Sequence, residues 1–172
     1  MPIYLIRHAH AVDADEDPRR PLSARGQSQL RQLLRFFQNR AAFQPLQFWH
    51  SPLLRARQTA ELLAGGLKSQ PALIETSGLL PDDSPDELAD RLEGSHEPDR
   101  IGVVGHLPHL SALATLLVRG KNGAEIFDFK KAAILALEAT GRSHKKTGRA
   151  LWEVCWFVTP EVFSEYQIEQ TT

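Results

Sequence analysis

Short apolar segments typical of strands alternate with longer amphipathic segments typical of helices along most of this 172-residue chain. This alternation predicts an α/β fold with a mainly parallel sheet and helices on both faces, because parallel neighbours need a long, usually helical, connection. The strands are predicted at Ile3–Arg7, Leu46–His50, Ala72–Glu75, Ile101–Val104, Ala132–Glu138 and Leu151–Val158.

Helix signals occupy the intervening segments. Ser23 is a predicted N-cap, and the helix after it carries apolar side chains at i, i+3, i+4 and i+7. Ser51-Pro52 and Ser84-Pro85 each combine a capping serine with a proline at the first helical position, where a missing N–H costs nothing. The predicted helices span residues 22 to about 40, 52 to about 63 (ending at Gly65-Gly66), 85 to about 92 (with Glu87 completing a capping box) and 107 to 118.

Size and composition restrict the class of protein. A chain of 172 residues is expected to form one domain, residues 1–172. The net charge of −1 argues against a nucleic-acid partner, and no apolar stretch is long enough to span a membrane. No secretory signal is visible, so a cytoplasmic location is expected. The single cysteine, Cys155, cannot form an internal disulfide.

Positively charged and imidazole side chains follow several predicted strands. Because the carboxyl ends of parallel strands meet at one edge of a sheet, these side chains are expected to converge there. Without an anion, such a cluster would be repulsive and poorly solvated. A phosphoryl group fits best, because guanidinium groups match its oxygens and nearby helix N-termini supply amide donors. The residues are Arg7 and His8, then His50, Ser51 and Arg55, and finally Gly105 and His106.

A histidine in this cluster can act as a nucleophile as well as a ligand. Neutral imidazole attacks phosphorus, and neighbouring arginine charges are expected to keep His8 neutral near pH 7 while neutralising the phosphate. Attack would give phosphorylated His8, which water would then cleave. His106 is expected opposite, donating to a phosphoryl oxygen.

Three separated segments resemble the signature motifs of the histidine phosphatase superfamily, which has the phosphoglycerate-mutase-like fold. They are LIRHAHA, SPLLRARQTA and VVGHLP, and they occur in the family's order. The short chain and the RPLSARG segment make it most similar to SixA-type phosphohistidine phosphatases. The resemblance implies a three-layer α/β/α sandwich with one antiparallel strand near the end of the chain. It also implies that His8 accepts the phosphoryl group, that Arg7, Arg55 and His106 hold it, and that Arg20 is a further anion contact.

Two features depart from the family pattern. Ala9 stands where the family usually has glycine, for which a small local adjustment is expected. Larger members carry a carboxylate that protonates the leaving oxygen, and the matching region, LLPDDSPDEL, offers only Asp82 and Asp83 outside the usual context. A weak acid suits a leaving group that departs easily, such as the imidazole of phosphohistidine. A phosphohistidine-containing signalling protein is therefore the expected substrate, with small phosphoesters as the alternative.

Other functions stay open on the residues alone. The His8-Ala9-His10 pair also occurs in metal-dependent barrel hydrolases, but such a barrel needs about 250 residues and no further metal ligands are evident. A non-catalytic reader of phosphorylated proteins would use the same binding groups, although it would not need the nucleophile. We expect no metal and no cofactor. The acidic run Asp13–Asp17 is expected to be a solvated loop, and His10, His50 and His109 to have structural or peripheral places.

Overall fold

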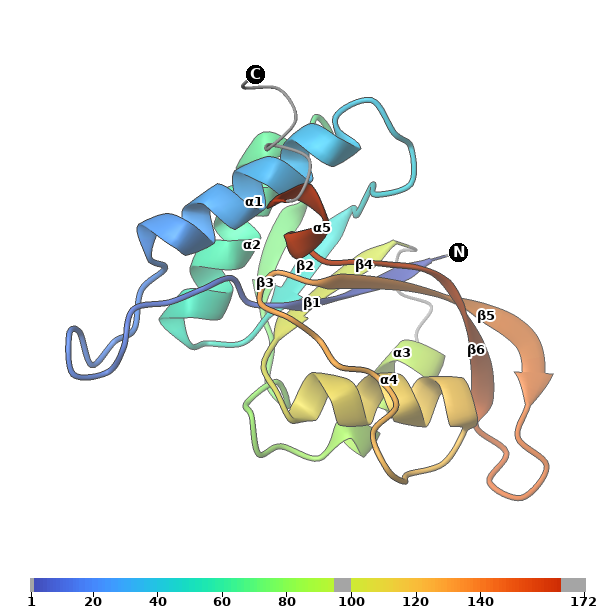
Figure 1. Cartoon of the computed structure of the whole chain (residues 1–172). Helices are drawn as coiled ribbons and strands as arrows, with labels where there is room; N and C mark the ends of the chain where they lie inside the picture. Colours follow the sequence, from blue (N-terminus) through green and yellow to red (C-terminus); the bar gives the residue numbers. More distant parts are fainter. Residues whose placement is uncertain (1, 95–99, 165–172) are drawn as a thin grey trace.

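The computed structural model describes residues 2–94 and 100–164, which form a six-stranded sheet with helices on both faces (Figure 1). The strand order is β3-β2-β4-β1-β5-β6. The strands are β1 (Ile3–Arg7), β2 (Gln47–His50), β3 (Ala72–Glu75), β4 (Ile101–Gly105), β5 (Ile134–Ser143) and β6 (Ala150–Val158).

Five of the six strands run in the same direction. β1 pairs in parallel with β4, β4 with β2, and β2 with β3. β5 is antiparallel to both of its neighbours, β1 and β6. The prediction of a mainly parallel sheet with one antiparallel strand late in the chain is confirmed. Because β5 runs against β1, the residues that enter β5 lie at the edge of the sheet where β1 ends.

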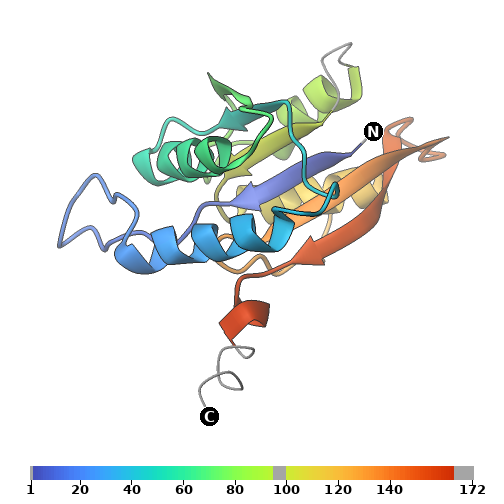
Figure 2. The ribbon, with the colours of Figure 1, turned by 90° about the horizontal axis from the view of Figure 1, so that it is seen from above.

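Helices lie on both faces of the sheet, as the two views of Figures 1 and 2 show together. A three-layer α/β/α sandwich is therefore confirmed. Within the described ranges, no helix has both the length and the apolar character needed to cross a membrane. One face carries α1 (Ala24–Phe37) and α2 (Leu54–Gly66), the other carries α3 (Pro85–Gly94) and α4 (His109–Arg119), and the short α5 (Glu161–Ser164) follows β6.

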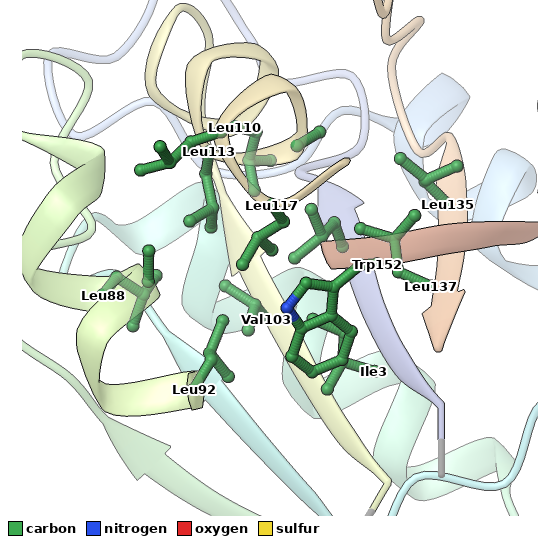
Figure 3. Close-up of a cluster of buried hydrophobic side chains, with 14 of the residues drawn as sticks. Ile3, Leu88, Leu92, Val103, Leu110, Leu113, Leu117, Leu135, Leu137 and Trp152 are labelled. Carbon is green, nitrogen blue, oxygen red and sulfur yellow. The ribbon is translucent and has the colours of Figure 1, made fainter. Parts of the chain in front are cut away.

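The side chains of each strand alternate between two hydrophobic clusters, as the period of a strand requires. Ile3 and Leu5 face α3 and α4, whereas Tyr4 and Ile6 face α1 and α2. Figure 3 shows the first cluster, in which leucines of α3 and α4 meet Val103, Leu135, Leu137 and Trp152.

The start of α1 holds the loop that follows β1. Ser23 is the N-cap, and its Oγ accepts a hydrogen bond from the Gly26 amide at 3.2 Å. The Ser23 amide donates to the His10 carbonyl at 3.0 Å. A Cβ at position 26 would lie 2.0 Å from that carbonyl oxygen, so only glycine permits this approach. The predicted cap is confirmed, and it positions the segment next to His8.

Several predicted boundaries were wrong. α2 begins at Leu54 with Leu53 as its N-cap, so Ser51 and Pro52 precede the helix, and α2 includes Gly65 and Gly66. Other elements differ from the prediction at their ends. For example, α1 ends at Phe37, α4 spans His109–Arg119, and β5 begins at Ile134 and continues through Gly141 to Ser143. Ser51 Oγ accepts the Leu53 amide at 3.3 Å before the helix begins, and it also lies 2.9 Å from His106 Nε2.

Candidate active site

Three segments that are far apart in the sequence meet at the carboxyl edge of the central strands. Arg7 pairs with Gly105 in the β1–β4 register, and the His8 amide donates to the Gly105 carbonyl at 3.0 Å. The Ser51 amide donates to the Val104 carbonyl at 3.1 Å. The backbone ladder therefore brings the ends of β1, β2 and β4 together, as the sequence predicted.

The ring of His8 is held in one orientation by the residue that follows it. His8 is 4% exposed, and its Nδ1 lies 2.7 Å from the Ala9 carbonyl oxygen. A carbonyl can only accept, so Nδ1 carries the proton of the neutral ring and Nε2 carries the lone pair. Ala9 is fully buried, and its φ lies outside the left-handed region, which explains why alanine is accepted there. The geometry presents Nε2 as the nucleophilic nitrogen.

The pKa of His8 is lowered to about 2, so the ring is neutral at physiological pH. Burial is the largest cause, followed by the charge of Lys131, with smaller contributions from His106 and Arg55, while the bond to Ala9 acts in the opposite direction. The His8 ring is neutral, as predicted, but the main cause differs from the predicted one. Burial and a lysine that the sequence analysis did not consider outweigh the arginines.

His106 lies beside His8, with 5.0 Å between the ring centroids. Its Nε2 is 2.9 Å from Ser51 Oγ, and its carbonyl accepts the Leu110 amide at 2.8 Å in the first turn of α4. Burial, together with the charges of Arg55 and Lys131, lowers the pKa of His106 to about 3. The ring is 2% exposed, and Nδ1 has no hydrogen-bond partner in the described part of the chain.

The two arginines of the motifs are partly buried at the same place. Arg7 Nη1 donates to the Phe129 carbonyl at 2.6 Å, which fixes one side of its guanidinium. Thr59 ties Arg55 to the first motif, because Thr59 Oγ1 donates to the Arg55 carbonyl at 2.7 Å and accepts the Ala9 amide at 3.1 Å. Burial lowers the pKa of both arginines. Both still carry a full positive charge, since arginine stays protonated in proteins.

The cluster has buried donors that no described residue satisfies. Arg7 Nε and Arg55 Nε are buried without a hydrogen-bond partner among residues 2–94 and 100–164. Buried polar groups are normally paired, so unpaired donors beside several positive charges indicate a place for an anion. A tetrahedral oxyanion would accept hydrogen bonds from these donors and offset the repulsion between the guanidinium groups.

Arg20 reaches the margin of this cluster from the loop between β1 and α1. Its Nε donates to the Val12 carbonyl at 3.2 Å, and its φ of 51° lies in the left-handed region. Its charge contributes to the lowered pKa of Arg55 and of Lys131, which places the guanidinium within electrostatic range of both. Its role as an anion contact stays a prediction.

The two candidate acids lie in the turn before α3. Asp83 Oδ2 accepts the Leu80 amide at 2.7 Å, so this carboxylate stabilises its own turn. Asp83 also acts electrostatically on His109, the first residue of α4. Asp82 is exposed to solvent. No hydrogen bond or ion pair of the described residues joins either carboxylate to His8, and their role as acids stays a prediction.

Sequence reasoning missed Lys131, and although it placed Ser51 at the converging edge and as a helix cap, it did not predict the contact of Ser51 with His106. Lys131 Nζ lies 3.4 Å from His8 Nε2. The available signal was positional: an antiparallel strand beside the first strand must begin at the edge where the first strand ends, and Lys130-Lys131 directly precede such a strand.

The other histidines and the acidic run have local contacts of their own. His10 Nδ1 is 2.8 Å from Ser23 Oγ, and His50 is buried with Nδ1 3.0 Å from the Ser51 carbonyl oxygen. His109 is 1% exposed. Three of the acidic residues in the run Asp13–Asp17 are exposed, and Asp17 forms a 3.0 Å ion pair with Arg19. Across the described ranges, no group of three or more His, Cys, Asp or Glu side chains is arranged to hold a metal ion.

Comparison with known proteins assigns this arrangement to a family. Residues 3–79, which contain the Arg7-His8 and Arg55 segments, match the family model of the histidine phosphatase superfamily, branch 1. His106 lies beyond the matched residues, and the structure places its ring centroid 5.0 Å from that of His8. The chain belongs to the histidine phosphatase superfamily. Its membership confirms the family resemblance predicted from the three motifs.

Similarity to individual proteins extends along most of the chain. An uncharacterised protein of Picosynechococcus sp. is 36% identical over 146 residues, covering 81% of this chain and 86% of the relative. The protein histidine phosphatase SixA, solved with tungstate, has a TM-score of 0.77 at 22% identity, covering 95% of this chain and 99% of that chain. An alpha-ribazole phosphatase from Shigella flexneri has a TM-score of 0.66 at 19% identity, covering 90% and 95%. The two structural likenesses establish a shared fold.

Proposed function

We propose that this protein is a phosphatase that forms a covalent phosphohistidine on His8. The observation that carries the proposal is the state of the His8 ring. Its Nδ1 hydrogen is bonded to the Ala9 carbonyl, which leaves the Nε2 lone pair beside a cluster of cations. A neutral, oriented imidazole next to unpaired guanidinium donors is what nucleophilic attack on a phosphoryl group requires.

The reaction has two steps. In the first, the His8 Nε2 lone pair forms an N–P bond while the bond from phosphorus to the leaving group breaks and the leaving group takes its electron pair. The phosphorylated ring is cationic with Nδ1 protonated, and the Ala9 carbonyl stabilises that proton. In the second, a water oxygen attacks phosphorus and the N–P electron pair returns to Nε2. Arg7, Arg55 and His106 stabilise the phosphoryl oxygens in both steps.

Phosphohistidine on a phosphotransfer protein is the substrate that we propose. The imidazole of phosphohistidine departs without a strong acid. Of the two candidate acids, Asp82 is exposed to solvent and Asp83 is hydrogen-bonded within its own turn. The connection from α2 to β3 contains only residues 67–71, so it provides no lid that would restrict the site to small substrates. A signalling role and a cytoplasmic location are predictions that accompany this substrate.

A comparison of leaving groups tests the proposed substrate. We expect phosphohistidine on a histidine-containing phosphotransfer protein to be hydrolysed at least about 100-fold more efficiently than an alkyl phosphate, since general acid catalysis contributes about 10²–10⁴-fold for poor leaving groups. Asp82→Asn and Asp83→Asn should slow alkyl phosphate hydrolysis more than phosphohistidine hydrolysis. The asparagine at position 83 can still accept the Leu80 amide. Initial rates of phosphate release from both substrates provide the measurement.

Two outcomes would contradict this assignment. Faster hydrolysis of the alkyl phosphate would favour a small-phosphoester phosphatase, the type of enzyme to which the structurally similar Shigella flexneri protein is assigned. Tight binding of the phosphoprotein without phosphate release would indicate a binding module. A single-turnover experiment with ³²P-labelled phosphoprotein distinguishes an enzyme from a binding module, because only an enzyme transfers the labelled phosphoryl group to water.

Ser51→Ala should weaken the site by releasing His106. The substitution removes the 2.9 Å contact to His106 Nε2 and leaves a buried imidazole nitrogen unpaired, at a cost of about 1–3 kcal/mol. We expect kcat/KM to fall by about tenfold, corresponding to ~1.4 kcal/mol. Thr115→Ala is a matched control, because it removes a buried 2.8 Å hydroxyl bond further along α4. If both variants retained the wild-type kcat/KM, Ser51 would have no positioning role.

A further inference from the structure

The segment that enters β5 is attached to the backbone of the Arg7-His8 motif. The Ala132 amide donates to the His8 carbonyl at 3.3 Å, and the Arg7 amide donates to the Ala133 carbonyl at 3.1 Å. Ala132 is fully buried with a φ of 60°, a left-handed conformation that is strained for a residue with a Cβ. Such a conformation persists only where the surroundings impose it, and it fixes the residue directly before it, Lys131, beside His8.

The side chain of Lys131 points toward the catalytic nitrogen. Its Nζ lies 3.4 Å from His8 Nε2, and the side chain is partly buried. No carboxylate in residues 2–94 or 100–164 forms an ion pair with it, whereas the neighbouring Lys130 is paired with Asp128 at 2.6 Å. Its charged neighbours are cations from three parts of the fold: Arg7 on β1, Arg20 in the loop after β1 and Arg55 on α2.

On the basis of the proposed function, we infer that Lys131 is a further phosphoryl-binding residue, whose ammonium contacts an oxygen of the phosphoryl group on His8 Nε2. Those oxygens lie one N–P and one P–O bond from Nε2, within reach of an ammonium that already touches this nitrogen. In a displacement with attacking and leaving atoms in line, the leaving group lies on the side of phosphorus opposite Nε2. Lys131 therefore binds an equatorial oxygen and does not protonate the leaving group.

If Lys131 binds the anion, the affinity of the site for anions must depend on pH in the alkaline range. Burial, followed by repulsion from Arg7, Arg20 and Arg55, lowers the pKa of Lys131 to about 8. The other groups that face it do not titrate near this pH, because guanidinium groups stay protonated and both histidines, His8 and His106, have strongly lowered pKa values. The ammonium is present below about pH 8 and is lost above it. Affinity for an anion in the unliganded site must therefore decrease as the pH rises from 7 to 9.5.

Binding of tungstate, followed by titration calorimetry, tests the inference independently of turnover. Tungstate remains a dianion over this range, so any pH dependence belongs to the protein. Lys131→Met should weaken binding at pH 7 by about 10–100-fold, the equivalent of one hydrogen bond to a charged group. Wild type should lose affinity by up to about 30-fold between pH 7 and pH 9.5, the limit that one proton with a pKa of about 8 sets. Lys131→Arg should retain its affinity at pH 9.5, because a guanidinium does not deprotonate there. Lys130→Met is the matched control and should bind as wild type does.

The inference and the proposed function fail in different ways. If Lys131→Met binds tungstate within twofold of wild type, or if Lys131→Arg loses affinity at pH 9.5 as wild type does, Lys131 is not a phosphoryl-binding residue. That result leaves His8 chemistry intact, which phosphate release by both proteins would show. If binding depends on Lys131 as expected but wild type releases no phosphate from any substrate, the anion site stands and the proposed phosphatase activity is wrong.

Discussion

Replacement of His8 by alanine is expected to abolish phosphate release, with kcat reduced by at least about 10³-fold, because the variant has no group that can form the N–P bond. The fold should persist. The buried ring makes its shortest hydrogen bond with the adjacent Ala9 carbonyl, and its 3.4 Å contact with Lys131 Nζ is with a partly buried ammonium that water can solvate instead. Steady-state phosphate release measures the loss, and thermal unfolding checks the fold.

A label-trapping experiment connects this loss to the covalent step. Wild type quenched during turnover with ³²P-labelled substrate should carry label that is stable in alkali and labile in acid, as a phosphorus–nitrogen bond requires, and His8→Ala should carry none. His144→Ala is a matched control, because this partly exposed histidine contacts Thr147 in the β5–β6 hairpin, and it should trap label as wild type does. Activity of His8→Ala within tenfold of wild type would exclude His8 as the nucleophile.

Arg55→Ala should have the second largest effect. Its guanidinium is partly buried beside both histidines, so its removal takes away a positioned charge that no solvent ion replaces equally well. We expect kcat/KM to fall by about 30–1000-fold, corresponding to ~2–4 kcal/mol of transition-state stabilisation. Arg55→Lys should recover only part of this loss, because an ammonium cannot form two parallel hydrogen bonds to a phosphoryl group.

Arg57→Ala provides the comparison for Arg55. Arg57 lies on the same helix but is exposed and paired with Glu61 at 3.2 Å, an interaction worth little to stability. It should retain wild-type kcat/KM and a similar unfolding temperature. A decrease of less than tenfold for Arg55→Ala, measured beside Arg57→Ala, would mean that Arg55 does not stabilise the transition state.

Much of the fold was predictable because its determinants are local. The apolar runs of β1 and β4 are buried on both faces, and such runs are recognisable without tertiary information. Ser23 capped its helix as predicted because the cap bond connects residues three positions apart. The prediction for Ser51 was wrong although its sequence signal was equally good. Its hydroxyl accepts the Leu53 amide at 3.3 Å ahead of the helix and also contacts His106, 55 residues away, a contact that local signals do not report.

The candidate site was likewise predictable only in part. The sequence placed Arg7, His8, Arg55 and His106 at one edge, since the ends of parallel strands must meet there. It did not include Lys131, because that residue belongs to no motif and approaches His8 only through the antiparallel direction of β5. It also attributed the neutrality of His8 to arginines, whereas burial is the dominant cause.

The sequence by itself determined the order of strands and helices and the identity of the groups that gather at the carboxyl edge of the sheet. Both follow from the periodicity of apolar residues and from where polar residues interrupt it. Only the tertiary structure decided the proton position on His8, the partner of His106 and the approach of Lys131 to Nε2. These depend on hydrogen-bond directions and on the exclusion of water, which exist only once the separate segments are packed together.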